Sequence, residues 1–240
     1  MPVPKISIIT AVYNAQKDIE KTIRSVINQS YLNIEYIIID GGSTDGTLDI
    51  IKKYDPKISH WVSESDNGVF DAMNKGIQYA TGDWINFMNA GDYFVDMDVI
   101  SNIDFESSKG YGLVYGNTEY ESHGIKRPFR ITSLQYGMIM ACHQSMFFNY
   151  ALLKNMLKYS SKFKLICDYD LVCKIVKHKY PTKYINQTIA HYMGGGLSAA
   201  INWEARKARY YYIFKYYQLS GVVHALLESS GIISLPKRIE

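Results

Sequence analysis

The sequence lacks several features that would assign it directly to a class of protein. It has only 3 cysteines in 240 residues and no Cys-x-x-Cys spacing, so we expect no zinc site and infer a reducing compartment. No segment approaches the roughly 18 consecutive apolar residues of a membrane-spanning helix, and no charged leader precedes a long apolar core. The net charge of +3 is too small to indicate nucleic-acid binding. We therefore expect a cytoplasmic protein that does not bind nucleic acid, with any membrane association peripheral, on the inner face of the membrane.

Apolar and aromatic residues are plentiful. The length leaves room for one large α/β domain, or for one domain with an appendage, and the apolar fraction of 47% can fill its core. Aromatic residues make up 14% of the chain, and 21 of them are tyrosines. A tyrosine combines a flat apolar ring with a hydroxyl group, which suits sugars, protein interfaces and membrane surfaces. Composition alone does not choose among these partners.

The first half of the chain alternates short apolar segments with amphipathic ones. Residues 5–12 and 34–40 are rich in isoleucine and valine, which predicts buried parallel strands. Residues 19–29 and 46–54 follow them and have helical spacing of apolar residues. Strand, helix, strand, helix is the order of an α/β fold in which helices flank a mainly parallel sheet.

Polar residues follow two of the predicted strands. Asp40 ends the second strand, and the strand over 84–88 leads into Asn89 and Asp92. Because open α/β sheets bind ligands at the carboxyl ends of their strands, we expect these side chains to share one edge. A helix over 69–80 places Asp71 and Asn74 near its first turns, three residues apart. The pattern predicts a ligand site there.

Short motifs recur in order between residues 6 and 198. They are residues 8–14 (Ile-Ile-Thr-Ala-Val-Tyr-Asn), 40–47 (Asp-Gly-Gly-Ser-Thr-Asp-Gly-Thr), 67–76 (Asn-Gly-Val-Phe-Asp-Ala-Met-Asn-Lys-Gly), 80–84 (Ala-Thr-Gly-Asp-Trp), 89–92 (Asn-Ala-Gly-Asp), 168–171 (Asp-Tyr-Asp-Leu) and 194–198 (Gly-Gly-Gly-Leu-Ser). With this set the chain resembles the family 2 glycosyltransferases of the GT-A fold, a Rossmann-like fold. It is most similar to the branch that builds bacterial exopolysaccharide, capsule and O-antigen, the colanic-acid type.

The resemblance implies an enzyme that moves a sugar from a nucleotide-sugar donor, with a UDP-sugar favoured, to a hydroxyl of a glycan or lipid-linked oligosaccharide. It implies inversion at the sugar and a role in cell-surface polysaccharide synthesis. Single-step inversion needs a base to accept the acceptor proton, and Asp168 matches the family's catalytic base at the start of a predicted helix. His143 and Gln144 fall near the expected acceptor cleft and are candidate acceptor contacts.

The resemblance also implies a set of donor-binding residues. Asp40 would accept a hydrogen bond from the base edge, because a carboxylate accepts from the imide N–H of uracil. Asp66 would lie beside the nucleotide. Asp71 would contact donor-sugar hydroxyls, although an acidic residue in a helix's first turn is explained equally well by the helix dipole. The implied nucleotide- and donor-binding set is Thr10, Val12, Tyr13, Asp40, Asp66, Asp71, Asn74 and Asn89.

The metal motif departs from the family's usual pattern. The family commonly has Asp-x-Asp followed by another Asp, whereas Asp92 is the one carboxylate in residues 89–92 of this chain. Mn²⁺ or Mg²⁺ can bind through one carboxylate, with diphosphate oxygens and waters as further ligands. We therefore expect Asp92 to hold a divalent cation, with His191 as a second candidate ligand.

Two other functions fit parts of the pattern. A nucleotide-sugar-binding protein with lost catalysis would explain the altered metal motif, but it has no use for a base at Asp168. A nucleotidyltransferase would need a glycine-rich phosphate loop with basic residues after the first strand, and residues 13–16 (Tyr-Asn-Ala-Gln) lack one. An active glycosyltransferase is the better interpretation.

We predict two parts of the chain, a glycosyltransferase domain over residues 1–200 and a C-terminal helical extension over 201–240. The extension is basic and aromatic, and it is explained either by packing across the domain or by contact with an anionic membrane surface. Its predicted helix, 203–217, carries one shared face of large apolar residues, Trp203, Tyr210, Ile213, Phe214 and Tyr217.

Overall fold

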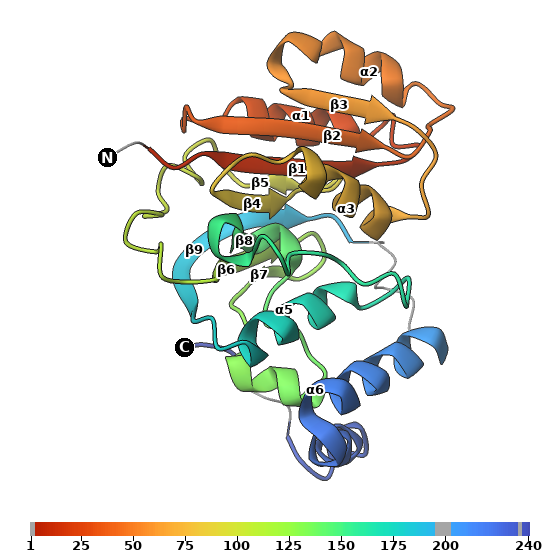
Figure 1. The fold of residues 1–240 in the computed structure, drawn as a ribbon, viewed down its shortest axis with the longest axis vertical. Helices are drawn as coiled ribbons and strands as arrows, with labels where there is room; N and C mark the ends of the chain where they lie inside the picture. The colour runs from red at the N-terminus through yellow and green to blue at the C-terminus, as the bar shows by residue number, and fades with distance from the viewer. Residues whose placement is uncertain (1–2, 195–202, 235–236) are drawn as a thin grey trace.

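One mixed sheet runs through the protein, with helices on both faces (Figure 1). The computed structural model describes residues 3–194, 203–234 and 237–240. The strands are β1 (Ile6–Val12), β2 (Ile34–Asp40), β3 (His60–Ser63), β4 (Trp84–Phe87), β5 (Tyr93–Phe94), β6 (Leu113–Tyr120), β7 (Gly124–Lys126), β8 (Met146–Asn149) and β9 (Thr182–Tyr192). The helices are α1 (Ile19–Ile27), α2 (Thr47–Lys53), α3 (Val69–Tyr79), α4 (Tyr150–Leu153), α5 (Cys167–Lys177) and α6 (Trp203–Ser229), with 3-10 turns η1 (Asp55–Lys57), η2 (Ile131–Tyr136) and η3 (His143–Ser145).

The parallel half of the sheet confirms the α/β prediction. The strand order is β3-β2-β1-β4-β8-β6-β9-β5, and β1 pairs in parallel with both β2 and β4. Val12 lies opposite Asp40, and Ile9 lies opposite Phe87. The carboxyl ends of these three strands therefore meet at one edge of the sheet.

The second half of the sheet mixes directions. Strand β8 is antiparallel to both β4 and β6, whereas β9 runs parallel to β6. Strand β5 is antiparallel to β9. At two residues, β5 is too short to produce a detectable alternation in the sequence. The antiparallel pairs bring the residues that follow β4 next to the residues that follow β9.

Two local sequence patterns predict structure that is not observed. The apolar residues at 99–103 predict a short helix, but this segment forms turns, because the Ile100 backbone N–H donates to Gln29 Oε1 at 3.1 Å instead of joining a helical ladder. Asn14 follows the first strand and is a good N-cap residue, but it does not cap α1. It has a positive φ of 46°, and its side chain accepts from the Thr44 backbone N–H at 2.9 Å, which joins the loops after β1 and β2.

The two faces of the sheet bury separate apolar clusters. Alternate residues of β1 point to opposite faces, so Ile9 packs with α3 and α5 while Ile8 packs with α1 and α2. The cluster under α3 and α5 also contains Ala208, Tyr212 and Ile213 of α6. The C-terminal helix is thus packed on the domain along this face, at the lower end of the view in Figure 1.

Candidate active site

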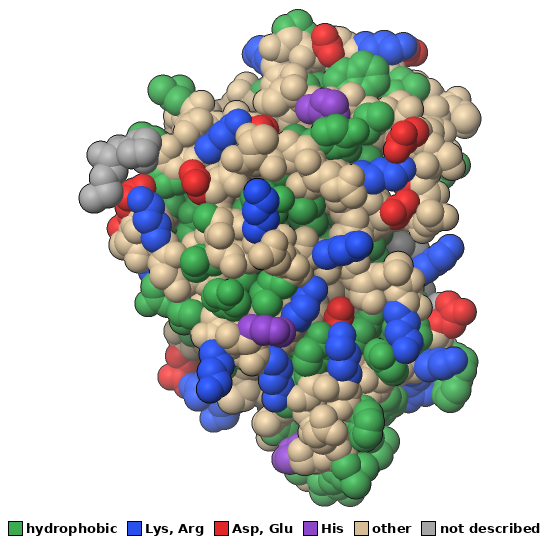
Figure 2. Space-filling view, in the orientation of Figure 1, with side chains coloured by type: hydrophobic (Ala, Val, Ile, Leu, Met, Phe, Trp, Pro, Cys, Tyr) green, Lys and Arg blue, Asp and Glu red, His purple; other side chains and the backbone are tan. Residues whose placement is uncertain are grey.

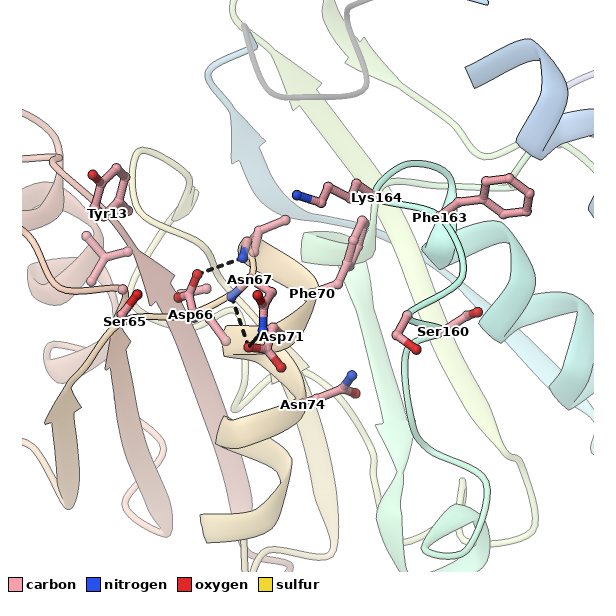
Figure 3. Close-up of a pocket in the computed structure, with 17 residues that line it drawn as sticks. Tyr13, Ser65, Asp66, Asn67, Phe70, Asp71, Asn74, Ser160, Phe163 and Lys164 are labelled. Carbon is pink, nitrogen blue, oxygen red and sulfur yellow. Dashed lines mark hydrogen bonds between the residues drawn. The ribbon is translucent and has the colours of Figure 1, made fainter. Parts of the chain in front are cut away.

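A cavity of about 980 Å³ opens at the carboxyl edge of the parallel strands. Its floor comes from the end of β1 and from Gly41, and one wall comes from the segment 65–74 that begins α3. The opposite wall is the loop that precedes α5, including Ser160, Phe163 and Lys164 (Figure 3). The cavity therefore lies where ligands bind in open α/β sheets.

One end of the cavity combines a flat aromatic ring with a carboxylate. Val12 and Tyr13 line it, and the Tyr13 side chain is exposed. Asp66 lies directly over Gly41, where a Cβ atom would come within 2.6 Å of its Oδ2. Asp66 Oδ1 accepts from the Gly68 backbone N–H at 2.7 Å, which fixes the carboxylate in place. The missing side chain at Gly41 is what allows Asp66 to take this position.

Asp40 and Thr10 do not lie where the sequence analysis placed them. The Asp40 carboxylate is fully buried and accepts from the Ser43 backbone N–H at 2.9 Å and from Ser63 Oγ at 2.6 Å, with further bonds from Gly42 and from Ser43 Oγ. Thr10 is also fully buried, and its hydroxyl donates to the Met88 carbonyl at 2.7 Å. Neither residue lines the cavity. Asp40 stabilises the turn after β2, and the carboxylate that faces the cavity belongs to Asp66.

Asp71 and Asn74 both line the cavity from α3. Asp71 Oδ2 accepts from the Asn67 backbone N–H at 3.0 Å, so it closes the turn before the helix. Asn74 binds the backbone of Tyr159 twice, accepting from its N–H at 2.8 Å and donating to its carbonyl at 3.0 Å. Asn74 therefore fixes the opposite wall of the cavity against α3.

Asp168 belongs to a hydrogen-bonded chain that crosses the sheet edge. Its Oδ2 lies 3.0 Å from His143 Nδ1, and His143 Nε2 lies 3.1 Å from Asn89 Nδ2. Asn89 Oδ1 accepts from the Ala11 backbone N–H at 3.3 Å, which turns the Asn89 amino group toward His143. In the neutral imidazole, Nε2 thus accepts from Asn89 and Nδ1–H donates to Asp168. The structure thus joins three predicted site residues, Asp168, His143 and Asn89, and none of the three is among the residues that line the cavity.

Burial and the neighbouring carboxylates shift the pKa of His143 in opposite directions. Burial lowers the pKa of His143, but the charge of Asp168, its hydrogen bond and the charge of Asp92 outweigh burial and raise that pKa. Burial and the Asp168 charge also raise the pKa of the neighbouring Tyr159 hydroxyl. The Asp168 side chain is 25% exposed, although its Oδ1 atom, which His143 does not contact, is buried.

Asp92 is buried beside the hydrogen-bonded series of Asp168, His143 and Asn89. Its Oδ1 accepts from the Met193 backbone N–H at 3.0 Å, and its Oδ2 accepts from Gln144 Nε2. Burial raises the pKa of Asp92, against the lowering effect of these hydrogen bonds. Gln144 is itself buried and binds Asp92, so the expected contact between Gln144 and an acceptor is not available in this arrangement. Its observed role is to hold the carboxylate.

His191 is also placed differently from the expectation. Its Nδ1 lies 3.0 Å from Glu119 Oε2, its Nε2 lies 2.7 Å from Glu121 Oε2, and its ring stacks on Tyr93. Both ring nitrogens therefore face glutamates instead of a cation held by Asp92. Within residues 3–194, 203–234 and 237–240, no cluster of three or more His, Cys, Asp or Glu side chains could hold a metal ion. The glycine triplet at 194–196 has no helix or strand propensity and predicts a mobile loop, and from residue 195 onward it lies outside the described residues.

The wall formed by residues 160–164 is not predictable from the sequence. This loop has no helical or strand periodicity, and its one signal in the sequence is that it leads directly into Asp168. The sequence also gives no sign that Asp66 occupies the space above Gly41, because the two residues are distant in sequence.

Comparisons with known proteins agree with this architecture. The glycosyl transferase family 2 model matches residues 7–179. A PGL/p-HBAD biosynthesis glycosyltransferase of Mycobacterium tuberculosis is 29% identical over 213 residues, which cover 84% of this chain and 82% of that protein. An uncharacterized glycosyltransferase of Haemophilus influenzae is 35% identical over 120 residues, 49% of this chain and 48% of that protein.

Two solved structures share the fold. S. aureus TarS in complex with UDP-GlcNAc superposes with a TM-score of 0.74 at 17% identity, covering 94% of this chain and 73% of that one. The mannosyltransferase PcManGT of Pyrobaculum calidifontis, in complex with GDP-Man and Mn²⁺, has a TM-score of 0.65 at 18% identity, covering 97% and 66%. The expected GT-A fold is confirmed, and the chain belongs to glycosyl transferase family 2.

Proposed function

We propose that this protein is an inverting glycosyltransferase that moves a sugar from a nucleotide-sugar donor, a UDP-sugar in first place, to a hydroxyl of a glycan or lipid-linked acceptor. The observation that carries the proposal is Asp168, held at 3.0 Å by His143 where the cavity wall leads into α5. A nucleotide-sugar-binding protein without catalysis is the alternative, but it would not need a carboxylate oriented by a histidine at this position.

Asp168 supplies the base in this mechanism. The acceptor hydroxyl gives its proton to the Asp168 carboxylate while its oxygen forms a bond to the anomeric carbon of the donor sugar. The bond from that carbon to the diphosphate breaks at the same time, and the nucleoside diphosphate leaves. Attack on the face opposite the leaving group inverts the configuration. His143 keeps the carboxylate oriented through Nδ1–H, so we assign it a positioning role for Asp168 in addition to its place near the acceptor.

The part of the cavity formed by Tyr13 and Asp66 suits the nucleoside. The exposed Tyr13 ring offers a stacking surface for a base, and the Asp66 carboxylate can accept from a base N–H group. The related TarS was solved with UDP-GlcNAc and PcManGT with GDP-Man, so both nucleotides are tested below.

Asp92 would hold a divalent cation if one participates. Its single carboxylate fits a Mn²⁺ or Mg²⁺ ion that takes its remaining ligands from diphosphate oxygens and water, provided that one hydrogen bond from Gln144 or Met193 is released. Such an ion would neutralise charge on the leaving diphosphate. The Asn89 amide would remain a neutral neighbour.

A donor screen tests the proposed function. Purified protein is incubated with UDP- and GDP-sugars, with and without Mn²⁺, and release of nucleoside diphosphate is measured. We expect release from one donor class above the others, increased by a hydroxyl-bearing glycan acceptor. Binding of a nucleoside diphosphate without turnover on any donor and acceptor would favour the binding-protein alternative.

The lower end of the molecule suits a membrane surface, consistent with a lipid-linked acceptor in cell-surface polysaccharide synthesis. Gln218 has non-helical angles (φ 57°, ψ −158°) and divides α6, after which Leu219, Val223 and Leu226 form an exposed apolar stripe. Figure 2 shows apolar side chains at this end and Lys and Arg side chains above them, the arrangement that favours an anionic bilayer. No helix in the described part of the chain is long and apolar enough to cross a membrane.

We expect the protein to co-sediment with vesicles that contain phosphatidylglycerol, less so as salt concentration rises. Leu219→Glu with Leu226→Glu should abolish this binding, since these side chains are 68% and 51% exposed and their loss leaves the core intact. Leu32→Glu is the matched control, because Leu32 is 97% exposed on the loop before β2. Equal binding by the double variant and the control would remove α6 from the membrane contact.

A further inference from the structure

The charges that line the cavity do not suit the ligand that we propose for it. Asp66 and Asp71 bring carboxylates to the wall, whereas a nucleotide-sugar donor carries a negatively charged diphosphate. Among the cavity-lining residues in the described part of the chain, Lys164 is the one with a cationic side chain. A diphosphate bound here without a positive partner would be repelled by the carboxylates.

Lys164 extends into the cavity from the wall opposite α3 (Figure 3). Its side chain is exposed, and its ammonium group makes no hydrogen bond or ion pair with any of the residues described in the structure. This separates it from Lys75 on α3, which is paired with Glu64 at 2.8 Å. The Lys164 charge is therefore available to a ligand.

The loop that carries Lys164 is anchored on both sides. Asn74 fixes Tyr159 at the start of the loop, and the Phe163 ring packs against Tyr211 and Tyr212 of α6 at centroid distances of 5.4 and 5.6 Å. The Phe163 carbonyl accepts from the thiol of Cys167, the first residue of α5, at 3.0 Å. These contacts keep the Lys164 backbone against the cavity while its side chain is free to reach a ligand.

The position of Lys164 corresponds to the middle of a bound donor. Tyr13 and Asp66 lie at the nucleoside end, whereas Asp168 must lie beside the anomeric carbon. The diphosphate connects these two parts of the donor and so lies between them. Lys164 precedes Asp168 by four residues, a separation that a chain spans in at most about 14 Å. We propose that Lys164 binds the diphosphate of the nucleotide-sugar donor, an inference that rests on the proposed function.

Lys162 provides a matched control on the same loop. Its ammonium group lies over the Tyr211 ring at 3.9 Å, on the α6 side, and it does not line the cavity. Lys162→Ala and Lys164→Ala therefore remove the same charge two residues apart, one outside the cavity and one inside it. A general effect of net charge on anion binding changes both variants equally.

The experiment compares a nucleoside diphosphate with its uncharged nucleoside, in EDTA so that no cation contributes. Wild-type protein is first titrated with UDP and with GDP, and the tighter ligand is then compared with uridine or guanosine by ligand-observed NMR. We expect Lys164→Ala to weaken the diphosphate by about 10- to 100-fold, the range for a charge-assisted hydrogen bond, and to leave the nucleoside unchanged. Lys162→Ala should bind both as wild type does, and Lys164→Arg should recover most of the affinity.

The other outcomes contradict the proposal in distinguishable ways. Undiminished diphosphate affinity in Lys164→Ala excludes the contact. Equal weakening of diphosphate and nucleoside assigns Lys164 a role in the shape of the cavity only. If wild-type protein binds neither UDP nor GDP, with or without Mn²⁺, the proposed function itself fails, independently of Lys164.

Discussion

Asp168→Asn is expected to lower kcat by about 10²- to 10⁴-fold, the range for a lost general base, while donor affinity stays close to that of wild type. The amide keeps the shape of the carboxylate, and its oxygen can still accept from His143 Nδ1–H. What it loses is the ability to accept the acceptor proton. Turnover with a saturating acceptor and nucleoside diphosphate affinity, measured on the same preparation, separate chemistry from binding.

Asp170→Asn is the matched control, because Asp170 is on the same turn of α5 and carries the same charge. Asp170 is buried and accepts from Lys215 Nζ and from the Tyr216 hydroxyl, both at 2.7 Å, so it joins α5 to α6. We expect this variant to lose about 1–3 kcal/mol of stability and to keep its kcat per folded molecule. Near wild-type transfer by Asp168→Asn would refute the mechanism, and equal loss of donor binding would make Asp168 a binding residue.

The edge of the sheet that carries the site was predictable, because the apolar patterns that define strands depend only on residues close together in the sequence. The apolar runs of β1, β2 and β4 each stop at turn-forming residues, and parallel strands must bring those stops together. Asn89 and Asp92 could therefore be placed at this edge from the sequence, whereas Asp168 was assigned through the family resemblance. The helix α3 was equally clear, because its apolar residues recur at steps of three and four.

Side-chain partners were not predictable, because they depend on contacts between distant segments. Asp40 is a carboxylate at a strand end in the sequence, yet Ser63 of β3 and the turn residue Ser43 bind it in the core. Gln144 is next to His143 in sequence, but one faces Asp92 and the other faces Asp168. Adjacent polar residues on a 3-10 turn point in different directions, so neighbouring positions do not imply a shared role.

Contacts between distant segments also explain why Asp66, and not Asp40, faces the cavity. A side chain at position 41 would clash with Asp66, so the glycine that follows Asp40 decides which carboxylate faces the cavity. The sequence shows a glycine at that position but does not show what occupies the space above it. In the proposed mechanism, Asp66 therefore takes the role that was predicted for Asp40, which is to accept a hydrogen bond from the base edge.

Removal of divalent cations with EDTA is expected to abolish transfer, and Mn²⁺ or Mg²⁺ should restore it. In Asp92→Asn, we expect turnover at fixed Mn²⁺ to fall by about 10²- to 10³-fold, the range for one lost electrostatic contribution to the transition state. If the cation acts through Asp92, EDTA should have little further effect on this variant, because both changes remove the same interaction. Activity is measured for wild type and variant, each with EDTA and with Mn²⁺.

The thermal stability of Asp92→Asn distinguishes a lost cation site from misfolding of the variant. Burial raises the pKa of Asp92, so its charged form is disfavoured in the folded protein. The charged carboxylate therefore lowers the free energy of unfolding at neutral pH. This destabilisation disappears as pH falls below the usual pKa of an aspartate. The Asp92→Asn substitution removes the buried charge, and Gln144 Oε1, which has no hydrogen-bond partner within the described residues, can accept from the new amide if Gln144 turns over. We therefore expect the thermal midpoint of Asp92→Asn at pH 7 to equal or exceed that of wild type. Full wild-type activity in EDTA, together with an active Asp92→Asn protein, would show that this carboxylate holds no cation and that the diphosphate leaves by another route.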